Sequence, residues 1–449
     1  MTDQPVEGVP PRLSITIGLI AGVSMLVLGA IRIGRSFGYD EGYTYFYFIN
    51  GGSVRRALTT QVVFNNHPTF SATQAIGWRL GLVGETAQRL GPVMCAAITV
   101  GLLVWFTARR CGVYGGLAAG VTLALNPIYL DQIRQLRGYA LATLGVFVAA
   151  LAIERSWVDP RRRWLVIQGV AMVVAVTTHA YSAVALLVIA VASLGMGRLR
   201  VAHLITWFSA AVVAFIMQIP LLDETRANIN GRGNVFQPDF PRFLGRALLG
   251  FEWPAVIIIG SATLLGAWTV ARQSSRHAAG VAAGALTLVL VVALVWGVAQ
   301  PRDLYARFFI SLLPFLAYLT GRGVAVLPGV AAPATVIAIG VVLAGGAGEI
   351  LDQRPTIRDG AAVAELARAN GLELCGRHAE PLFVYTAPFR LVNGVDDLGD
   401  CEVFISVLSV GTPQREAADA RFDASRNLGG SVRVWTDQSV VDIVVPPKD

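Results

Sequence analysis

The chain has 449 residues, of which 54% are hydrophobic and only 14% are charged, and its mean hydropathy is +0.59. Soluble proteins carry about a quarter charged residues, so this composition excludes an ordinary soluble domain and indicates a helical protein that crosses a membrane repeatedly. The net charge is +7, but all basic residues except Lys448 are arginine. This bias reflects genome composition, and arginines at helix ends act as topology signals, so no nucleic-acid partner is expected.

Eleven apolar stretches predict transmembrane helices. The first, near Leu13–Ile31, follows an acidic N-terminus without a small-residue cleavage site, so we expect it to be retained in the membrane. The others lie near Leu90–Thr107, Gly115–Leu130, Leu136–Ile153, Trp164–Thr178, Ala183–Met196, Ile205–Leu222, Pro254–Ala271, Ala279–Val298, Phe308–Leu319 and Gly329–Gly345.

A further segment, Thr69–Gly84, is apolar but short and is interrupted by Gln74 and Arg79. If it does not cross, five arginine clusters fall on one side, which the positive-inside rule identifies as the cytoplasm. The clusters are Arg109-Arg110, Arg161-Arg162-Arg163, Arg198 with Arg200, Arg272 with Arg276, and Arg322. We therefore expect a multi-pass protein of the cytoplasmic membrane with a cytoplasmic N-terminus, in which Thr69–Gly84 lies along or dips into the outer surface.

The composition changes after residue 349, which predicts two domains: a transmembrane domain, residues 1–349, and a small extracytoplasmic domain, residues 350–449. In the second domain we expect a helix near Ile357–Asn370. Strands are expected near Pro381–Tyr385, Glu402–Val407, Ser431–Trp435 and Val440–Val445. The predicted fold class is an all-α polytopic membrane protein of about 11 transmembrane helices with a C-terminal α/β extracytoplasmic domain.

The four cysteines fall into two groups. Cys95 lies within a predicted span and Cys111 at a cytoplasmic helix end, and both are expected to pack as small apolar side chains. Cys375 and Cys401 lie in the predicted extracytoplasmic domain, where an oxidising environment permits a disulfide between them. No Cys/His spacing resembles a zinc site.

Polar motifs gather on the predicted outer side. The most informative is Asp40-Glu41, because carboxylates at the exit of a membrane span are costly unless the protein uses them. The motifs that follow are Asn65-Asn66-His67-Pro68, Asp131-Gln132-Ile133-Arg134-Gln135-Leu136-Arg137-Gly138-Tyr139, Thr178-His179-Ala180-Tyr181 and Arg302-Asp303-Leu304-Tyr305-Ala306-Arg307.

This order of motifs resembles the membrane-embedded glycosyltransferases of the C superfamily, and more closely the branch of protein O-mannosyltransferases and lipid A aminoarabinose transferases. Members of that branch have an acidic motif after the first helix, a His/Lys-Pro-Pro element and an Arg-x-Tyr motif. The chain departs from the pattern at Thr69, where a second proline is expected, and at Gln135, where an acid is expected. Asp131, about one helical turn earlier, is the alternative second acid.

The resemblance implies transfer of a sugar from a polyprenyl-phosphate donor to an envelope glycan, lipid or protein at the outer face of the membrane. Asp40 is the expected catalytic base, and Glu41 would orient the acceptor or Asp40. Guanidinium groups match phosphate geometry bidentately, so arginines are expected to meet the leaving phosphate. The expected donor-binding residues are His67, Arg134, Arg137, Tyr139, His179, Tyr181 and Arg307. No cofactor is expected, and a divalent metal bridging Asp40 and Glu41 is the less favoured alternative.

Other interpretations remain open. Arg134 is equally explained as an anchor at the membrane interface, and His67 and His179 as structural histidines. The whole chain could instead be a transporter or flippase of lipid-linked sugars, although it shows no internal duplication and its acids cluster at one face. A non-catalytic envelope assembly protein of the same fold would explain Thr69 and Gln135.

Overall fold

The computed structural model describes residues 9–61, 66–159, 161–232, 236–299, 304–352, 357–377, 379–391, 403–409, 431–435 and 439–444. The chain divides into two compact units. The first comprises Met1–Ile31, His67–Phe70 and Leu90–Leu351, and the second comprises Arg32–Asn66, Ser71–Arg89 and Asp352–Asp449. The division falls inside helices α4 (Pro68–Arg79) and α5 (Gly84–Ala124).

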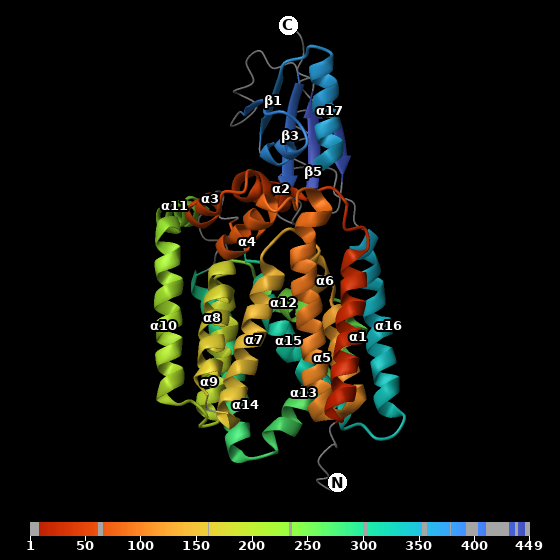
Figure 1. Ribbon diagram of the computed structural model, residues 1–449. Coiled ribbons are helices and arrows are strands. Elements are labelled where there is room, and N and C mark those ends of the chain that lie inside the picture. The colour runs from red at the N-terminus through yellow and green to blue at the C-terminus, as the bar shows by residue number, and fades with distance from the viewer. Residues whose placement is uncertain are drawn as a thin grey trace. The chain divides into compact units, whose positions relative to one another are not determined.

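Long apolar helices build the first unit (Figure 1). After α1 (Pro11–Ala30) and most of α5 come α6 (Pro127–Ile133), α7 (Tyr139–Val158), α8 (Arg162–Thr178), α9 (Ser182–Gly195), α10 (Val201–Gln218), η2 (Ile219–Leu221), α11 (Leu222–Arg232), α12 (Phe240–Leu249), α13 (Trp253–Ala271), α14 (Ser275–Leu294), η3 (Val295–Ala299), η4 (Ala306–Leu312), α15 (Leu313–Ala325) and α16 (Ala331–Asp352). Large apolar side chains such as Leu19, Phe208 and Leu264 are 66%, 72% and 73% exposed. Such surfaces suit helices that face lipid rather than water.

Helix α5 is two helices that reverse direction at Gly112. This glycine has φ 78° and ψ 175°, a backbone conformation that is open to glycine and strained for other residues. Beyond it, Gly116 lies against Ala108 and Gly120 lies against Val104. Residues 113–124 therefore run back, antiparallel, along the helix that precedes Gly112.

Among the described residues, eight helical segments are long and apolar enough to cross a membrane. The eleven spans predicted from the sequence are therefore not confirmed, although the polytopic helical class is. One of the eight, Gly84–Ala124, contains the stretch predicted at Leu90–Thr107 and most of the one predicted at Gly115–Leu130, which Gly112 divides into two antiparallel helices. In addition, α8 and α9 have only 17 and 14 residues, fewer than the roughly 20 that a straight span needs. With 12 residues, α4 is also too short to span, which agrees with the prediction for Thr69–Gly84.

Arginines gather at one end of the first unit. Arg110 pairs with Glu154 on α7, Arg322 of α15 contacts Cys111, and Arg200 contacts the Trp157 carbonyl. The start of α1 reaches the same end, because the Val9 N–H donates to the Ala108 carbonyl. The polar motifs around Arg137 and His179 stand at the opposite ends of α7 and α8. This relative placement agrees with the one predicted from the sequence.

The second unit combines short helices with one sheet. Its helices are the distal part of α4, α2 (Tyr39–Thr44), η1 (Tyr45–Ile49), α3 (Val54–Thr59), α17 (Ile357–Ala369) and η5 (Glu380–Val384). The strands are β1 (Leu374–Arg377), β2 (Arg390–Leu391), β3 (Val403–Ser409), β4 (Ser431–Trp435) and β5 (Ser439–Val444), in the order β2-β1-β3-β5-β4. Strand β1 is parallel to β2 and β3, whereas β5 is antiparallel to β3 and β4. Ile357, Leu382 and Ile405 are fully buried in its core.

Most of the elements predicted for the C-terminal segment are confirmed, as α17, β3, β4 and β5. The strand predicted at Pro381–Tyr385 is wrong, because this segment is the 3₁₀-helix η5 with Pro381 in its first turn, where the missing N–H costs nothing. Strands β1 and β2 are too short to give a periodic signal. The division at residues 349 and 350 stays a prediction, and the second unit also contains Arg32–Asn66 and Ser71–Arg89.

The cysteines divide as expected. Cys95 and Cys111 are free thiols within the first unit, half-buried and buried respectively. Cys375 is fully buried and disulfide-bonded. Cys401 lies outside the described residues, so the pairing of Cys375 with Cys401 stays a prediction.

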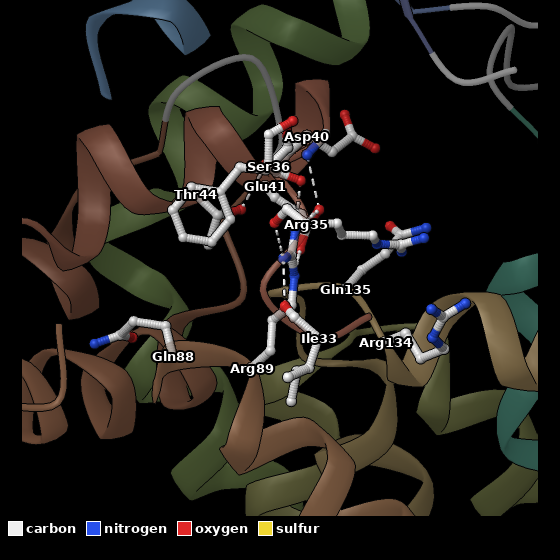
Figure 2. A network of polar contacts seen from close by, with 12 residues as sticks. Ile33, Arg35, Ser36, Asp40, Glu41, Thr44, Gln88, Arg89, Arg134 and Gln135 are labelled. Carbon is white, nitrogen blue, oxygen red and sulfur yellow. Dashed lines mark hydrogen bonds and ion pairs between the residues drawn. The ribbon is translucent and has the colours of Figure 1, made fainter. Parts of the chain in front are cut away.

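A buried ion pair fixes the N-terminal part of the second unit (Figure 2). Arg89 Nε lies 2.7 Å from Glu41 Oε1 and Arg89 Nη2 lies 2.8 Å from Glu41 Oε2, and the two side chains are 0% and 1% exposed. The other Arg89 donors reach the carbonyls of Ile33, Arg35 and Ser36. Glu41 also accepts the Gly38 N–H at 2.8 Å. One guanidinium group therefore connects three backbone carbonyls of the segment before α2 to the Glu41 side chain of α2.

The charge of Glu41 is stabilised by this arrangement. Burial by itself raises the pKa of the Glu41 carboxyl. The charge of Arg89 and its hydrogen bonds, the charge of Arg35 and the Gly38 N–H act in the opposite direction, so the pKa lies below its ordinary value. Glu41 is therefore an ionised structural group at neutral pH, and it is a poor carrier of protons.

Removing one partner of this pair should destabilise the second unit. Glu41→Gln keeps the shape but leaves the buried Arg89 charge uncompensated, which costs about 3–5 kcal/mol. The exposed Glu365–Arg368 pair on α17 supplies a matched control, and Glu365→Gln should change stability little. The thermal unfolding midpoint of the purified protein measures both effects. An unchanged midpoint in Glu41→Gln would contradict this role. Because the pKa of folded Glu41 is lowered, the stabilisation is present above the unfolded pKa and is lost as pH falls through the folded pKa.

Candidate active site

The predicted site residues fall in two groups, one in each compact unit. Asp40 and Glu41 belong to the second unit, and the predicted donor-binding residues belong to the first. In each group the side chains project from the ends of helices, and these helix ends determine which side chains meet.

The two acids of the Asp40-Glu41 motif have different environments. Both lie in the first turn of α2, where carboxylates interact favourably with the helix N-terminus. Glu41 is at the third helical position, and its side chain accepts the N–H of Gly38 at the N-cap, as in a capping box. Asp40 is only half-buried, and its carbonyl accepts the Thr44 hydroxyl at 2.9 Å. Of the two carboxylates, Asp40 is thus the one that solvent and a ligand can reach.

In the first unit, a short helix leads into the arginine motif. Asn126 is the N-cap of α6: its side-chain oxygen accepts the N–H groups of Ile128 and Tyr129 at 3.1 and 3.2 Å, and Pro127 occupies the first turn. Helix α6 ends at Ile133, and residues 134–138 form a tight connection to α7. Arg134 and Arg137 therefore project from one compact turn and are only 2% and 5% exposed.

His67 and Arg137 form the centre of this group. His67 Nδ1 lies 2.9 Å from the Thr178 carbonyl, and because a carbonyl only accepts, this nitrogen carries the proton. The other ring nitrogen, Nε2, then presents a lone pair, which accepts from Arg137 Nη2 at 3.1 Å and Nε at 3.3 Å. The Thr178 carbonyl thus sets the tautomer of His67, and His67 in turn holds one edge of the Arg137 guanidinium.

Aromatic rings connect the other motifs to this pair. His67 stacks on His179 with ring centroids 5.5 Å apart, and Tyr139 lies 4.8 Å from His179. On the far side, Phe308 packs against both His179 and Tyr181, at 5.6 and 4.6 Å. The adjacent Arg307 lies over the Tyr305 ring at 4.4 Å. The structure therefore brings together His67, Arg137, Tyr139, His179 and Tyr181, with Arg307 beside them, and their role in binding a donor stays a prediction.

Both histidines of this cluster are neutral. Burial lowers the pKa of His67 well below its ordinary value, and the charges of Arg137 and Arg307 lower it further. The same causes, in the same order, lower the pKa of His179 to about 3. Two uncharged imidazoles thus lie in the positive field of two guanidinium groups. Such a field favours an anion, and neutral imidazoles can hydrogen-bond to it without adding charge.

Arg134 has different hydrogen-bond acceptors from Arg137. Its Nη1 donates to the Ile350 carbonyl at 2.6 Å and its Nη2 to the Ile31 carbonyl at 2.7 Å. These carbonyls lie at the C-terminal ends of α16 and α1, where a cation is favourable. Arg134 therefore joins two helix ends, and of the two interpretations offered for it the structural one has this direct support.

Gln135 and Thr69, the two residues that depart from the family pattern, both form side-chain hydrogen bonds. Gln135 donates to Asp131 Oδ1 at 2.9 Å, and Gln132 donates to Asp131 Oδ2 at 2.5 Å. The alternative second acid is thus held between two amides. Thr69 shares a hydrogen bond of 2.6 Å with Thr177.

Sequence reasoning missed Arg89 and Phe308. Arg89 had one detectable signal: it is a cation at the predicted outer end of a span, where the positive-inside rule disfavours arginine unless an acid accompanies it. Asn65, Arg302 and Asp303, which the motifs include, lie outside the described residues. Within the described ranges no group of three or more metal-ligating side chains occurs. A metal-free mechanism stays a prediction.

Comparisons with known proteins bear on this geometry. A family model described as dolichyl-phosphate-mannose-protein mannosyltransferase matches residues 65–222, which is less than half of the chain. These residues contain His67, Arg137 and His179. No curated protein sequence matches the chain.

Solved structures match over almost the whole chain. ArnT from Cupriavidus metallidurans, bound to undecaprenyl phosphate, has a TM-score of 0.61 and 14% identity, covering 97% of this chain and 99% of ArnT. AglB from Archaeoglobus fulgidus, in complex with an inhibitory peptide and a dolichol-phosphate, has a TM-score of 0.53 and 11% identity, covering 94% and 73%.

The arabinofuranosyltransferase AftD from Mycobacteria has a TM-score of 0.52 and 14% identity, and the match covers the whole of this chain but only 41% of AftD. At such low identities these matches establish the fold. The chain thus resembles the membrane-embedded glycosyltransferases of the C superfamily, in fold over nearly its whole length and in sequence over residues 65–222, as the order of its motifs predicts.

Proposed function

We propose that the protein is a glycosyltransferase that moves a sugar from a polyprenyl-phosphate donor to an acceptor of the cell envelope. The observation that carries this proposal is the buried cationic cluster of Arg137, Arg307 and two neutral histidines, His67 and His179. Its charge is complementary to a phosphate group. The structures of ArnT bound to undecaprenyl phosphate and of AglB in complex with a dolichol-phosphate support a donor of this class.

In the proposed reaction an acceptor hydroxyl attacks the anomeric carbon of the donor sugar. Asp40 takes the hydroxyl proton as the new glycosidic bond forms. The bond between the anomeric carbon and the phosphate oxygen breaks, and polyprenyl phosphate leaves with the electron pair. A half-buried carboxylate suits the role of base better than the ion-paired Glu41, which we assign to the structure of α2.

The leaving phosphate gains negative charge in the transition state. Arg137 would stabilise that charge, because a guanidinium pairs with two phosphate oxygens at once. His67 is a positioning residue, since its Nε2 holds Arg137 and its Nδ1 proton is committed to the Thr178 carbonyl. Arg307 adds to the positive field. Tyr139, His179 and Tyr181 supply the aromatic surface of the proposed donor site.

We further propose that the reaction takes place at the outer face of the cytoplasmic membrane. The arginine-rich end of the first unit would then face the cytoplasm, in keeping with the positive-inside rule. The expected consequence is a cytoplasmic N-terminus and an extracytoplasmic C-terminal segment.

Reporter fusions test this orientation. A reporter joined after Asp449 should report the extracytoplasmic side, and one inserted within Val158–Arg163 should report the cytoplasm. The insertion within Val158–Arg163 is the control, because it should give the cytoplasmic signal with which the signal after Asp449 is compared. A cytoplasmic signal after Asp449 would refute the proposed orientation.

Arg137 is predicted to act on the donor phosphate. Arg137→Ala should reduce the release of polyprenyl phosphate from a polyprenyl-phosphate sugar by about 10²–10³-fold, as for loss of one oxyanion donor. Arg137→Lys should also be poor, because a point charge replaces a bidentate fork. Arg134→Lys is the matched comparison: it should lower the thermal midpoint, because the links to Ile31 and Ile350 are lost, more than it lowers the turnover of folded protein. Full activity in Arg137→Ala would exclude Arg137 from the donor site.

Asp40 is predicted to be the catalytic base. Asp40→Asn preserves size and most hydrogen bonding but cannot accept a proton, so transfer should fall by about 100-fold or more. The thermal midpoint should hardly change, in contrast to Glu41→Gln, because Asp40 is half-buried. Normal transfer by Asp40→Asn together with an inactive Asp131→Asn would assign the base to Asp131. Donor binding without transfer in the unaltered protein, with every envelope acceptor, would instead favour a non-catalytic role.

A further inference from the structure

A cavity lies at the arginine-rich end of the first unit, the opposite end from the His67–Arg137 cluster. It has a volume of about 410 Å³ and is formed by α5, α7 and α8. This volume is within the range of small-molecule sites in proteins. None of its lining residues takes part in the proposed transfer reaction.

The cavity has an apolar wall and a cationic rim. Beside the ion-paired Arg110 and Glu154, its lining residues are Leu102, Trp105, Phe106 and Arg109 on α5 and Val148, Leu151, Ala152 and Arg155 on α7. Both sets follow the spacing i, i+3, i+4 and i+7, so each helix presents one continuous stripe to the cavity. In both stripes the arginine comes last, about two turns from the first apolar residue. The polarity of the cavity therefore changes along the helix axes from hydrocarbon to guanidinium.

The rim carries an excess of positive charge. Arg110 is ion-paired with Glu154 and lies over the Phe106 ring, with its guanidinium carbon 3.8 Å from the ring centroid. Arg109 and Arg155 are exposed, and within the described chain neither guanidinium has an ion-pair or hydrogen-bond partner. Two unpaired cations beside one neutralised pair give this end of the cavity a charge complementary to an anion.

We propose that this cavity binds an anionic phospholipid, whose phosphate lies between Arg109 and Arg155 and whose acyl chain follows the apolar stripes of α5 and α7. A free phosphate would leave the wall of Leu102, Val148 and Leu151 without a partner. A zwitterionic lipid would leave the cationic rim uncompensated. An anionic lipid satisfies both features at once, and juxtamembrane arginines attract such lipids. The site is independent of the proposed transfer function.

The experiment compares binding of lipids to the purified full-length protein by native mass spectrometry and by thermal shift. The probes are phosphatidylglycerol, phosphatidylcholine, polyprenyl phosphate and inorganic phosphate. The test variant is R109Q/R155Q. The matched control is R272Q/R276Q, which removes two exposed arginines from the same end of the first unit but outside the cavity.

Phosphatidylglycerol should bind the unaltered protein and the control variant equally, and it should bind R109Q/R155Q at least about tenfold more weakly, given the contribution of each surface arginine. Leu151→Trp, which fills the cavity without changing charge, should weaken the same binding. Equal losses in both arginine variants, or equal binding of phosphatidylcholine, would overturn the proposal. So would binding that depends on Arg109 and Arg155 with polyprenyl phosphate alone, or with inorganic phosphate alone, because each identifies a different ligand.

Discussion

The bidentate pair between Arg89 and Glu41 is the interaction on which the proposed catalytic segment depends. A buried guanidinium must satisfy all its donors, since an unpaired buried charge is costly. Arg89 does so by reaching both oxygens of Glu41 and the carbonyls of three residues between Ile33 and Ser36. The chain from Ile33 to Glu41 therefore has little freedom. Asp40 lies within that segment, so the same pair that removes Glu41 from chemistry also fixes the backbone that carries Asp40.

The two units control charge by opposite means. Near Glu41, cations stabilise an ionised acid, so a carboxylate remains charged although it is buried. Near His67 and His179, cations and burial keep two bases neutral. In the proposed reaction Asp40 is the acid that exchanges a proton, and the positive charge near the two histidines comes from arginines, which do not titrate at physiological pH.

Local patterns in the sequence predict the long helices and strands, but they do not predict which individual side chains contact each other. The long apolar stretches predict the membrane helices because a span needs about 20 apolar residues, and the alternation at Ser431–Trp435 predicts a strand because one face of it is buried. The turn at Gly112 falls in the gap between the two stretches predicted at Leu90–Thr107 and Gly115–Leu130, so the interruption of the apolar pattern indicated it. The positions of His67, Arg137 and His179 could be predicted because each follows or precedes a helix end on the same side. The pairing of Arg89 with Glu41, 48 positions apart, could not be predicted from any local pattern.

Arg134 and Arg137, only three positions apart, also have contacts that the local sequence does not predict. Both are buried arginines of one motif, and their residue type and spacing do not distinguish them. Only the helix ends do: Arg134 meets the last carbonyls of α1 and α16, whereas Arg137 meets His67. The carbonyl acceptors belong to residues distant in the chain, so the distinction between the structural Arg134 and Arg137, the proposed phosphate ligand, requires the tertiary fold.

The hydrogen bonds around His67 also show what Thr69 does in the structure. In the family pattern a second proline would stiffen the start of the helix that follows the histidine. Here Thr69 bonds to the hydroxyl of Thr177, and two residues earlier His67 bonds to the carbonyl of Thr178. These two hydrogen bonds join the start of α4 to the end of α8 side by side. The ring of His67 is thereby held in the orientation that presents its lone pair to Arg137. In this chain, hydrogen bonds between two segments therefore hold the start of α4 in place.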